Sequence, residues 1–427
     1  MSVRIIRPTI ARGRLHAPPS KSYTHRALVA AFLTGRPCRV VRPLDSDDTR
    51  ATRDGLLALG ARIRTSTTGW TVSPTRQAAR RTHCPIHCGE SGTTLRLLSA
   101  VATLGAEPIT FEGAPQLATR PMGELFGALR QLGATVQCPP RGRALPCTVQ
   151  GPIHSGDVTL RGDVSSQFTS ALLMVLPTVE GRSTVRIEGP TVSQPYVEAT
   201  CAVLRDRGVR VQRTPTGFDV PGDQRYHSGP IQVPGDASSA AYLWAAGAAS
   251  GGSVEVTGVS TKLPQADLAI LSVLSKMGAH VDRASGGIRV SGPLSRPVDV
   301  DLTGSPDLFP LVAVLAALVP KGRSRLFGAP HLQFKESNRR AQSVRLARAM
   351  GADVSETPAR VQITGTPVPR PFTLSSLHDH RLVMSAAVAG LEGSGPSHVG
   401  EAEAVSKSFP GFWDAFGALT RSGERGP

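Results

Sequence analysis

SKSYTHRALVAAFLTG (residues 20–35) is the first of six similar stretches in this chain of 427 residues. Each has a polar start rich in Ser, Thr or Asp, an apolar body and a closing glycine. The other five are SGTTLRLLSAVATLG (91–105), SSQFTSALLMVLPTVEG (165–181), DASSAAYLWAAGAASG (236–251), SPDLFPLVAVLAALVPKG (305–322) and HDHRLVMSAAVAGLEG (378–393). The closing glycines lie 70 to 76 residues apart, a spacing that chance would not keep five times. Such self-similarity indicates an architecture built from repeats.

Each stretch predicts a buried helix. Ser, Thr and Asp at the start can cap free backbone amides, and the closing glycine suits the left-handed position that follows a helix. The bodies are apolar on most faces, so water should reach few of these side chains.

A second helix recurs with the endings LLALGARI, LRQLGATV, LRDRGVRV, LSKMGAHV and ARAMGADV, whose glycines are 60, 133, 208, 278 and 351. Its arginines favour a solvent-facing position, and its sixth copy, near Gly417, is degenerate. Short β-branched runs such as VEVTG and hairpin patterns such as AHVDRASGGIRV fill the intervals. Each repeat therefore predicts a β-α-β-α-β-β unit in an α/β (α+β) chain.

Three repeats per domain would give two similar domains. Pro18–Pro19 and Val233–Pro234–Gly235 are the best hinge candidates. We therefore expect one domain at 20–234 and a second made of 1–19 plus 235–427.

The totals narrow the function classes. A net charge of +16 favours anionic partners, but the basic residues are scattered without a stripe or interleaved aromatics, which weakens the case for nucleic acid. No apolar run is long enough for a membrane span, and the N-terminal residues have no signal-peptide core. Six cysteines without metal-site spacing predict buried thiols in a reducing cytoplasm. We expect a cytoplasmic protein, a monomer, without membrane association.

The starts of the predicted helices carry the chemistry. Lys21 and Arg26 lie at the first one, where a cation opposes the helix dipole, so capping alone does not explain them. Free amides and added cations at a helix start suit phosphate. The candidate charges are seven cations against the carboxylates Asp307 and Glu336; the cations are Lys21, Arg26, Arg120, Lys335, Arg339, Arg381 and Lys407. The surplus of five matches the roughly −5 that two phosphorylated carboxylates would bring.

Three of these cations lie in the first predicted domain and four in the second. The site should therefore lie between the domains, whose halves should repel each other until ligand enters. Lys335 and Arg339 are expected on one face of a helix that begins at KESNR.

Ten motifs in order resemble the 5-enolpyruvylshikimate-3-phosphate (EPSP) synthase family. They are PSKSYTHRAL (19–28), LDSDDTR (44–50), SGTTLR (91–96), TRPMG (119–123), SSQF (165–168), SQPY (193–196), GDASSA (235–240), KESNR (335–339), DHR (379–381) and SKSFP (406–410). The resemblance covers nearly the whole chain and implies two inside-out domains of three repeats each.

The resemblance also implies residue roles. Shikimate 3-phosphate would be held by Lys21, Ser22, Arg26, Ser165, Ser166, Gln167, Ser193, Asp307 and Lys335. Phosphoenolpyruvate would be held by Lys21, Gly92, Arg120, Gln167, Arg339, Arg381 and Lys407. Glu336 would protonate the enol methylene and Asp307 would accept the 5-hydroxyl proton, with Lys21 as a further catalytic cation. No metal or organic cofactor is expected.

Two positions depart from the family pattern. Glu90 stands where a neutral residue usually precedes the glycine turn, and Asn338 replaces the usual Asp in KESNR, which could loosen the orientation of Arg339. A weakened homologue is therefore one alternative. Others are the sister transferase acting on UDP-N-acetylglucosamine, although FEGAPQLAT (111–119) lacks its usual cysteine, and a non-catalytic nucleic-acid binder on the same repeat.

Overall fold

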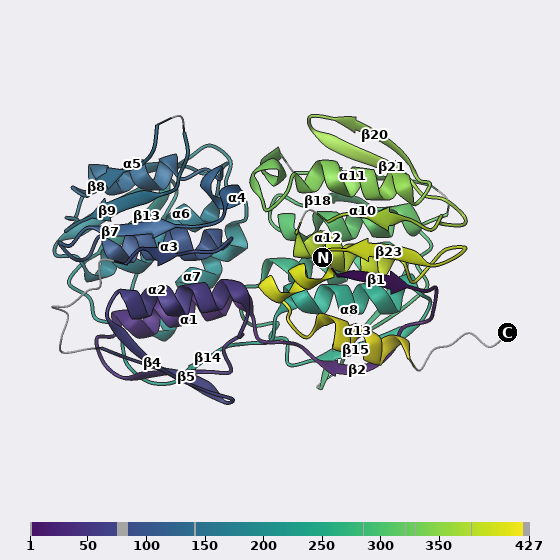
Figure 1. Cartoon of the computed structure of the whole chain (residues 1–427), viewed down its shortest axis with the longest axis horizontal. Helices are drawn as coiled ribbons and strands as arrows, with labels where there is room; N and C mark the ends of the chain where they lie inside the picture. Colours follow the sequence, from purple (N-terminus) through teal and green to yellow (C-terminus); the bar gives the residue numbers. More distant parts are fainter. Residues whose placement is uncertain are drawn as a thin grey trace. The chain divides into compact units, whose positions relative to one another are not determined.

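The structure is a computed structural model that describes residues 2–74, 84–140, 142–284, 286–320, 322–328, 330–376 and 378–421. The chain forms two compact units, one of Pro19–Val233 and one of Met1–Pro18 with Pro234–Pro427. Both are α/β, as the repeats predicted, and the described residues of each form three sheets with helices between them (Figure 1).

The third repeat of Pro19–Val233 shows the predicted order in full. Strand β10 (Asp157–Arg161) leads into α6 (Ser166–Val175) and returns as β11 (Arg182–Glu188), parallel to β10. Helix α7 (Gln194–Asp206) follows, and then the hairpin β12 (Gln212–Thr214) and β13 (Gly217–Pro221). The sheet order β10-β11-β13-β12 places the parallel pair beside the hairpin.

The second repeat follows the same plan, with an extra short helix. It contains β6 (Ile86–His87), α3 (Gly92–Ala102), β7 (Ile109–Glu112), α4 (Pro115–Ala118), α5 (Gly123–Gln131), β8 (Thr135–Gln137) and β9 (Cys147–Gln150).

The first repeat takes one strand from the far end of the unit. It runs α1 (Lys21–Leu33), β3 (Cys38–Val41), α2 (Asp47–Ala58), β4 (Ala61–Ser66) and β5 (Gly69–Pro74). Its parallel partner strand is β14 (Ile231–Gln232), which pairs with β3. The chain therefore closes this unit on itself before it leaves at Val233.

The other unit also borrows strands, here from the N-terminus. Its first repeat is α8 (Ala237–Ala249), β15 (Ser253–Thr257), η2 (Ala266–Leu268), α9 (Ala269–Lys276), β16 (His280–Ala284) and β17 (Gly287–Ser291). Strand β2 (Arg12–His16) pairs in parallel with β15.

The second repeat of this unit is β18 (Asp299–Asp301), η3 (Pro306–Leu308), α10 (Phe309–Leu318), β19 (Arg323–Phe327), η4 (Pro330–Phe334), α11 (Arg339–Ala349), β20 (Asp353–Thr357) and β21 (Arg360–Thr364). The third is β22 (Thr373–Leu374), α12 (His380–Ala389), β23 (Ser397–Gly400), η5 (Ala402–Lys407) and α13 (Phe412–Thr420). Strand β1 (Val3–Ile6) pairs antiparallel with β23, in the position that a hairpin strand has in the other sheets; the described residues of the sixth copy form no hairpin.

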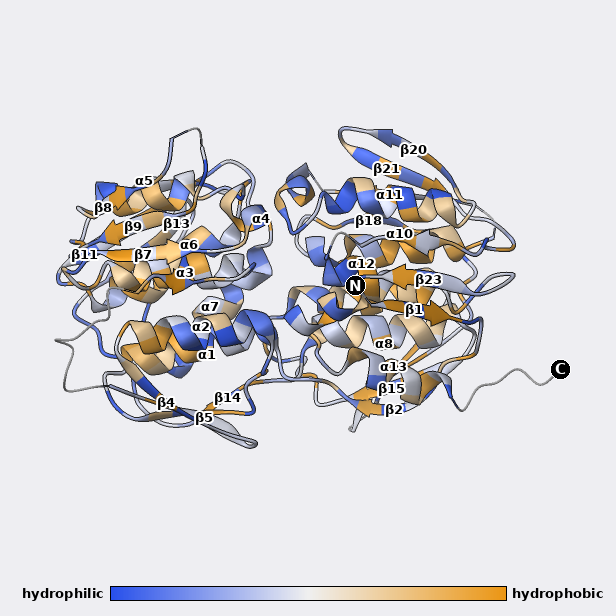
Figure 2. Ribbon diagram, viewed as in Figure 1, coloured by the Kyte–Doolittle hydropathy of each residue, from blue (hydrophilic) through white to orange (hydrophobic). Residues whose placement is uncertain are grey.

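The six inner helices are buried, as their apolar bodies predicted. In α8 and α10 nearly every side chain is inaccessible to water, and both belong to one large core with α12. Figure 2 shows the contrast with α11, which is mainly hydrophilic. Apolar burial of this kind supplies the largest favourable term in folding, so the inner helices hold their starting residues in fixed positions.

The predicted role of the closing glycines is right for only part of the set. Gly35 and Gly251 follow the C-cap directly and have φ values of 61° and 67°. The other four inner helices end earlier. Val319 and Pro320 follow α10 and Pro177 follows α6, and a proline ring prevents the helix from continuing. The outer-helix glycines, by contrast, all have φ between 74° and 106°; they are Gly60, Gly133, Gly208, Gly278 and Gly351.

Candidate active site

Lys21 begins the first inner helix and contacts a carboxylate. Its Nζ lies 2.8 Å from Asp48 Oδ2, and both side chains are largely buried. Asp48 lies in the first turn of α2, where a carboxylate is favoured by the helix dipole. Asp48 therefore holds the Lys21 ammonium at the start of α1, against the dipole that would repel it.

Arg26 lies one turn further along α1 and is only 3% exposed. Its four hydrogen bonds all go to neutral oxygens in the part of the chain that the structure describes: Thr200 Oγ1 (2.8 Å), Ser22 O (2.9 Å), Tyr196 O (2.9 Å) and Ser170 Oγ (3.4 Å). Burial lowers the pKa of Arg26 to about 10. A buried guanidinium with neutral partners is a place where an anionic ligand would be stabilised.

Gly92 begins α3 and lies against two guanidinium groups. A Cβ atom placed on Gly92 would lie 2.8 Å from Arg120 Nη1 and 3.1 Å from Arg96 Nη1. Arg120 precedes α5, in the turn after α4. Glycine at position 92 thus leaves room for two cations beside a helix start.

Gln167 connects the second and third repeats. Its Oε1 accepts a hydrogen bond from Arg96 Nη1 at 2.8 Å, and its Nε2 donates to Thr93 Oγ1 at 3.1 Å. Ser165 caps α6 by accepting from Gln167 N, and Ser166 is the first residue of that helix. Ser193 is the N-cap of α7 and has a left-handed φ of 56°.

The predicted residues of Pro19–Val233 therefore lie at the starts of the inner helices α1, α3 and α6, the start of α7 and the turn before α5. Hydrogen bonds and close approaches join several of them in two groups within this unit. One group links Ser22 and Arg26 to the chain around Tyr196, and the other contains Gln167 and Arg96 beside Gly92 and Arg120.

Arg339 is the centre of the predicted residues in the other unit and is 1% exposed. Its Nη1 donates to Asp307 Oδ1 at 2.8 Å, its Nε donates to Asp379 Oδ2 at 2.8 Å, and its Nη2 donates to Glu336 Oε2. Burial alone would lower the pKa of Arg339, but these three carboxylates raise it. One guanidinium thus holds the expected base, Asp307, and the expected acid, Glu336, at adjacent nitrogens.

Asp307 receives two further cations. Lys335 Nζ lies 3.4 Å from its Oδ1, and Arg381 Nη2 lies 3.2 Å from its Oδ2. Burial would raise the pKa of Asp307, but the nearby charges of Lys335, Arg381 and Arg339 hold it well below its usual range. The carboxylate is therefore ionised at neutral pH, as a proton acceptor must be.

The prediction that Lys335 and Arg339 share one face of a helix is wrong. Helix α11 begins at Arg339, and Asn338 is its N-cap, with Oδ1 accepting from Ala341 N at 3.2 Å. Lys335 precedes the helix, and both cations reach Asp307 from different segments. Asn338 thus keeps a capping role that Asp would also serve, and Arg339 is oriented by its three carboxylates rather than by residue 338.

Lys407 and Asp379 lie near each other in the sixth repeat. Lys407 ends η5, and its Nζ donates to His378 O at 2.5 Å. Asp379 caps α12 by accepting from Arg381 N at 2.9 Å and also accepts from Ser337 Oγ. One carboxylate therefore fixes both Arg339 and the helix start that carries Arg381.

Sequence reasoning missed several partners. Asp48 lies in the quoted LDSDDTR motif, but nothing in the motif shows that it pairs with Lys21. Asp267, in η2, is 1% exposed and accepts from Ser238 Oγ; burial raises its pKa to about 6, with Arg381 and Asp307 nearby. No sequence signal marks Asp267, because its only local context is the end of an ordinary loop.

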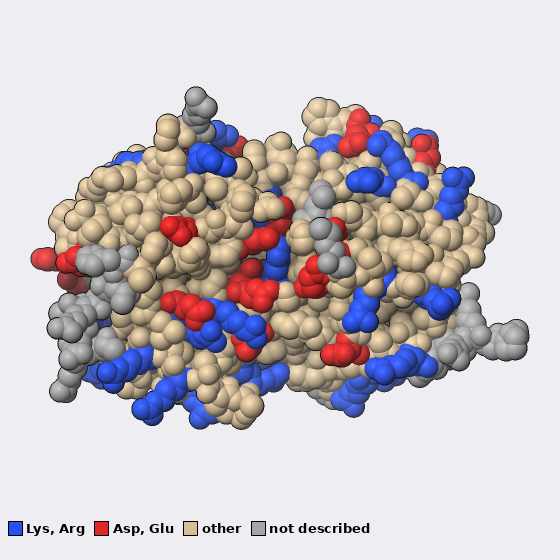
Figure 3. Space-filling view, viewed as in Figure 1, with Lys and Arg blue, Asp and Glu red and all other residues tan. Residues whose placement is uncertain are grey.

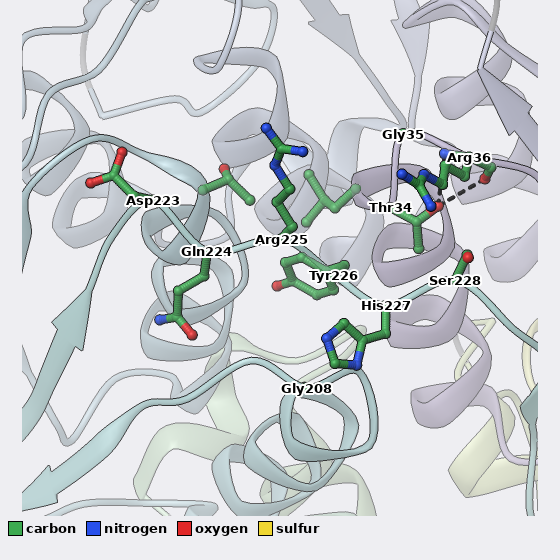
Figure 4. A pocket seen from close by; sticks show the side chains of 12 residues that line it. Thr34, Gly35, Arg36, Gly208, Asp223, Gln224, Arg225, Tyr226, His227 and Ser228 are labelled. Carbon is green, nitrogen blue, oxygen red and sulfur yellow. Dashed lines mark hydrogen bonds between the residues drawn. The ribbon is translucent and has the colours of Figure 1, made fainter.

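Other features do not compete with this site. A cavity of about 1150 Å³ in Pro19–Val233 lies where α1 and α7 end, lined by Gly35, Gly208 and the segment Asp223–Ser228 (Figure 4). It contains none of the predicted site residues, and helix C-termini attract cations rather than phosphates. Among the described residues no group of His, Cys, Asp or Glu could hold a metal ion, and no described helix could cross a membrane.

On the face seen in Figure 3, Lys and Arg side chains lie in separate groups with Asp and Glu among them. A dispersed distribution of this kind lacks the continuous basic stripe of nucleic-acid-binding surfaces.

Two units of buried inner helices, with buried cations and two carboxylates held on Arg339, have the architecture that the sequence resemblance leads us to expect of an enolpyruvyl transferase. Residues 7–416 match the EPSP synthase (3-phosphoshikimate 1-carboxyvinyltransferase) family, and the chain belongs to it. The 3-phosphoshikimate 1-carboxyvinyltransferase of Methanocorpusculum labreanum is 39% identical over 406 residues, 94% of each chain. That of Halobacterium salinarum is 38% identical over 97% of this chain and 98% of the relative.

Solved structures agree with this membership. EPSP synthase from Acinetobacter baumannii has a TM-score of 0.80 and 25% identity over 98% of both chains. The enolpyruvyl transferase NikO from Streptomyces tendae has a TM-score of 0.77 and 16% identity, over 98% of this chain and 97% of that one, and shows the same fold. The predicted fold class is therefore confirmed.

Proposed function

We propose that this chain transfers the enolpyruvyl group of phosphoenolpyruvate to the 5-hydroxyl of shikimate 3-phosphate. The products are inorganic phosphate and 5-enolpyruvylshikimate 3-phosphate. The observation that carries the proposal is the pairing of Asp307 and Glu336 on the buried guanidinium of Arg339, within the EPSP synthase family. The reaction needs an acid and a base beside the same carbon atom, and Glu336 and Asp307 would provide these two groups.

We assign the phosphate of shikimate 3-phosphate to Arg26 and Lys21, with Ser22, Ser165, Ser166 and Ser193 as donors. Arg26 supports this assignment because it is buried with neutral partners and would gain a counter-ion on binding. Helix starts at Lys21 and Ser166 add backbone amides. We assign the ring hydroxyls of shikimate 3-phosphate to Asp307, Lys335 and Gln167.

We assign phosphoenolpyruvate to the remaining cations. Arg120 beside Gly92 supports a subsite with room for an anion at the start of α3. In the other unit Arg339, Arg381 and Lys407 supply charge for the carboxylate and the leaving phosphate. Preorganised cations stabilise the charge that develops on such a leaving group.

The acid must change partners during the reaction. Glu336 is held as an anion by Arg339 Nη2 in the ligand-free chain, and an anion cannot donate a proton. An incoming carboxylate or phosphate that takes this guanidinium nitrogen would release Glu336 to bind a proton. Glu336 then protonates C3 of phosphoenolpyruvate, and C2 becomes cationic.

Asp307 completes the chemistry. It accepts the 5-hydroxyl proton as that oxygen attacks C2, which gives a tetrahedral ketal phosphate. Phosphate leaves with the proton held by Asp307, as C3 returns its proton to Glu336. Lys335, Arg381 and Arg339 keep Asp307 ionised at the start of the cycle.

We further propose that ligand brings the site residues of Pro19–Val233 together with those of the other unit, because each unit carries only part of the predicted site. Repulsion between the cations would oppose closure of the free protein and favour it once phosphates are bound. Solution scattering with shikimate 3-phosphate should give a smaller radius of gyration. An unchanged radius would contradict the placement of the site between the units.

Phosphate release is the direct test. Purified chain given both substrates should release phosphate, and neither substrate alone should support release. UDP-N-acetylglucosamine in place of shikimate 3-phosphate should give none, and release with that acceptor only would favour the sister transferase. Retention on a nucleic-acid column at physiological salt, together with no release, would favour the non-catalytic alternative.

We propose a monomer that works in a reducing cytoplasm. All six cysteines are free, and four of them are buried, which suits a compartment that keeps thiols reduced. Light scattering coupled to size-exclusion chromatography should give the mass of one 44.8 kDa chain.

A further inference from the structure

Arg96 joins three segments of Pro19–Val233 although it was assigned no ligand. It lies on α3 and is 7% exposed. Its Nη1 donates to Gln167 Oε1 at 2.8 Å, its Nη2 donates to Pro121 O at 3.3 Å, and its Cζ lies 5.3 Å from the centre of the Phe168 ring. The guanidinium is therefore fixed between the start of α6 and the turn that follows Arg120.

The contact to Gln167 determines which end of its amide faces a ligand. The two ends of a glutamine amide have nearly the same shape, so hydrogen-bond partners decide the orientation. Arg96 offers only donors, so Oε1 must face it. Nε2 then faces Thr93 Oγ1 at 3.1 Å and keeps a second N–H. Reversal would turn an oxygen toward any anion bound at the start of α3.

Arg96 also lies beside the proposed phosphoenolpyruvate subsite. Its Nη1 and that of Arg120 both flank Gly92, at 3.1 Å and 2.8 Å from the position of a Cβ atom there. The guanidinium that orients Gln167 is thus next to the cation proposed to bind the anion. A change at Arg96 reaches the ligand through Gln167 and through the local charge.

We propose that Arg96 is a positioning residue that holds the Gln167 amide with its NH2 group toward the anionic substrates. The proposal rests on the proposed function for its kinetic consequence. The orientation itself is a property of the ligand-free chain. The two can therefore be tested separately.

The kinetic test is a double-mutant cycle with Arg96→Gln and Gln167→Ala. Each single variant should lower kcat/KM for phosphoenolpyruvate by about 10- to 100-fold, because a displaced binding group costs that much. The double variant should lose no more than about twofold beyond Gln167→Ala, because the two residues act as one unit. If the loss in kcat/KM of the double variant equalled the product of the two single losses, the proposal would be overturned, since Arg96 would then act independently of Gln167.

A matched control separates positioning from folding. Arg207 is also 7% exposed, lies in the same unit and donates to the backbone oxygens of His227, Gly229 and Pro230. Arg207→Gln should lower the unfolding temperature without changing the Michaelis constant for either substrate. If the Michaelis constant rose equally in Arg96→Gln and Arg207→Gln, the effect would be a general structural one, and the proposal would be contradicted.

The orientation can be read without any substrate. In a ¹⁵N–¹H NMR spectrum the Gln167 side-chain NH2 signals, assigned by their loss in Gln167→Ala, should be well dispersed in the parent chain. In Arg96→Gln they should move to random-coil positions. Unchanged signals would overturn the proposal even if the enzyme is active. Moved signals in a chain that releases no phosphate would support the positioning role and contradict the proposed function instead.

Discussion

Arg339 Nη1 donates a 2.8 Å hydrogen bond to Asp307 Oδ1, from a side chain that is almost entirely enclosed. The same guanidinium also contacts Asp379 and Glu336, so one buried cation is shared by three carboxylates. Burying several charges together is tolerable only while they remain paired. Arg339 is therefore both a proposed ligand-binding group and a structural requirement of its unit.

Replacing Arg339 by Met should destabilise the unit strongly. Removing one partner from a buried ionic group costs about 3–5 kcal/mol, because the remaining charges lose their compensation. Urea unfolding at neutral pH would measure the loss. Arg345→Met, on the exposed side of the same helix, is the matched control and should change the free energy of unfolding by less than about 0.5 kcal/mol. Equal small effects in the two variants would contradict the role of Arg339.

Replacing Glu336 by Gln should abolish turnover and leave ligand binding largely intact. Glutamine keeps an oxygen that can accept from Arg339 Nη2 but cannot deliver a proton to carbon. The expected loss in kcat is about 10²- to 10⁴-fold, the usual contribution of a general acid. Calorimetry should show shikimate 3-phosphate affinity within a few fold of the parent value. Glu356→Gln, on exposed β20, should keep full activity. Normal turnover in Glu336→Gln would remove it as the proton donor.

Replacing Gly92 by Ala should weaken phosphoenolpyruvate binding. The new methyl group would meet Arg120 Nη1 at 2.8 Å and must displace it by a few tenths of an ångström. We expect the Michaelis constant for phosphoenolpyruvate to rise about 10-fold while that for shikimate 3-phosphate changes little. Gly127→Ala, where no atom lies within 4 Å of the added carbon, should alter neither constant. The subsite assignment fails if Gly92→Ala binds phosphoenolpyruvate normally.

The repeats and the buried inner helices could be predicted because their signal is local and recurs six times. The helices α1, α3, α6, α8, α10 and α12 all lie within the six quoted stretches. The expected boundaries put residues 1–19 with 235–427, but the repeats did not reveal which strands pair across these long separations. β14 has two residues and no pattern of its own, and β1 and β2 pair with strands more than 200 residues away. Pairings at such separation depend on tertiary packing rather than on local propensity.

The candidate site was predictable to a similar depth. The cations at the first helix start, Lys21 and Arg26, were predictable because a cation there opposes the helix dipole. The carboxylates that hold these cations were less visible. Asp48 pairs with Lys21 across 27 residues, and Asp379 pairs with Arg339 across 40. A carboxylate in a loop or at a helix cap looks the same in sequence whether it meets an arginine or water.

His25 provides a test of stability that involves no substrate. It belongs to α1, its ring is fully buried, and its Nδ1 lies 2.7 Å from Thr52 Oγ1. Burial, with Lys21 and Arg26 nearby, holds the pKa of His25 well below its usual value. As pH falls below about 6.5, the His25 ring therefore binds a proton in the unfolded chain but stays neutral in the folded chain. Stability is complete above that pH and is lost progressively below it.

His25→Gln should be less stable than the parent chain at pH 7.5 but should lose less on acidification. Between pH 7.5 and 5.5 the parent should lose about 1.4 kcal/mol more than the variant, the cost of one proton over one pH unit below 6.5. Urea unfolding followed by the indole NMR signal of Trp70, the only tryptophan of Pro19–Val233, reports on this unit. Replacing the exposed His227 of the same unit by Gln should leave the parent pH dependence unchanged. Equal acid losses in the parent and His25→Gln would show that the His25 ring accepts its proton inside the folded unit.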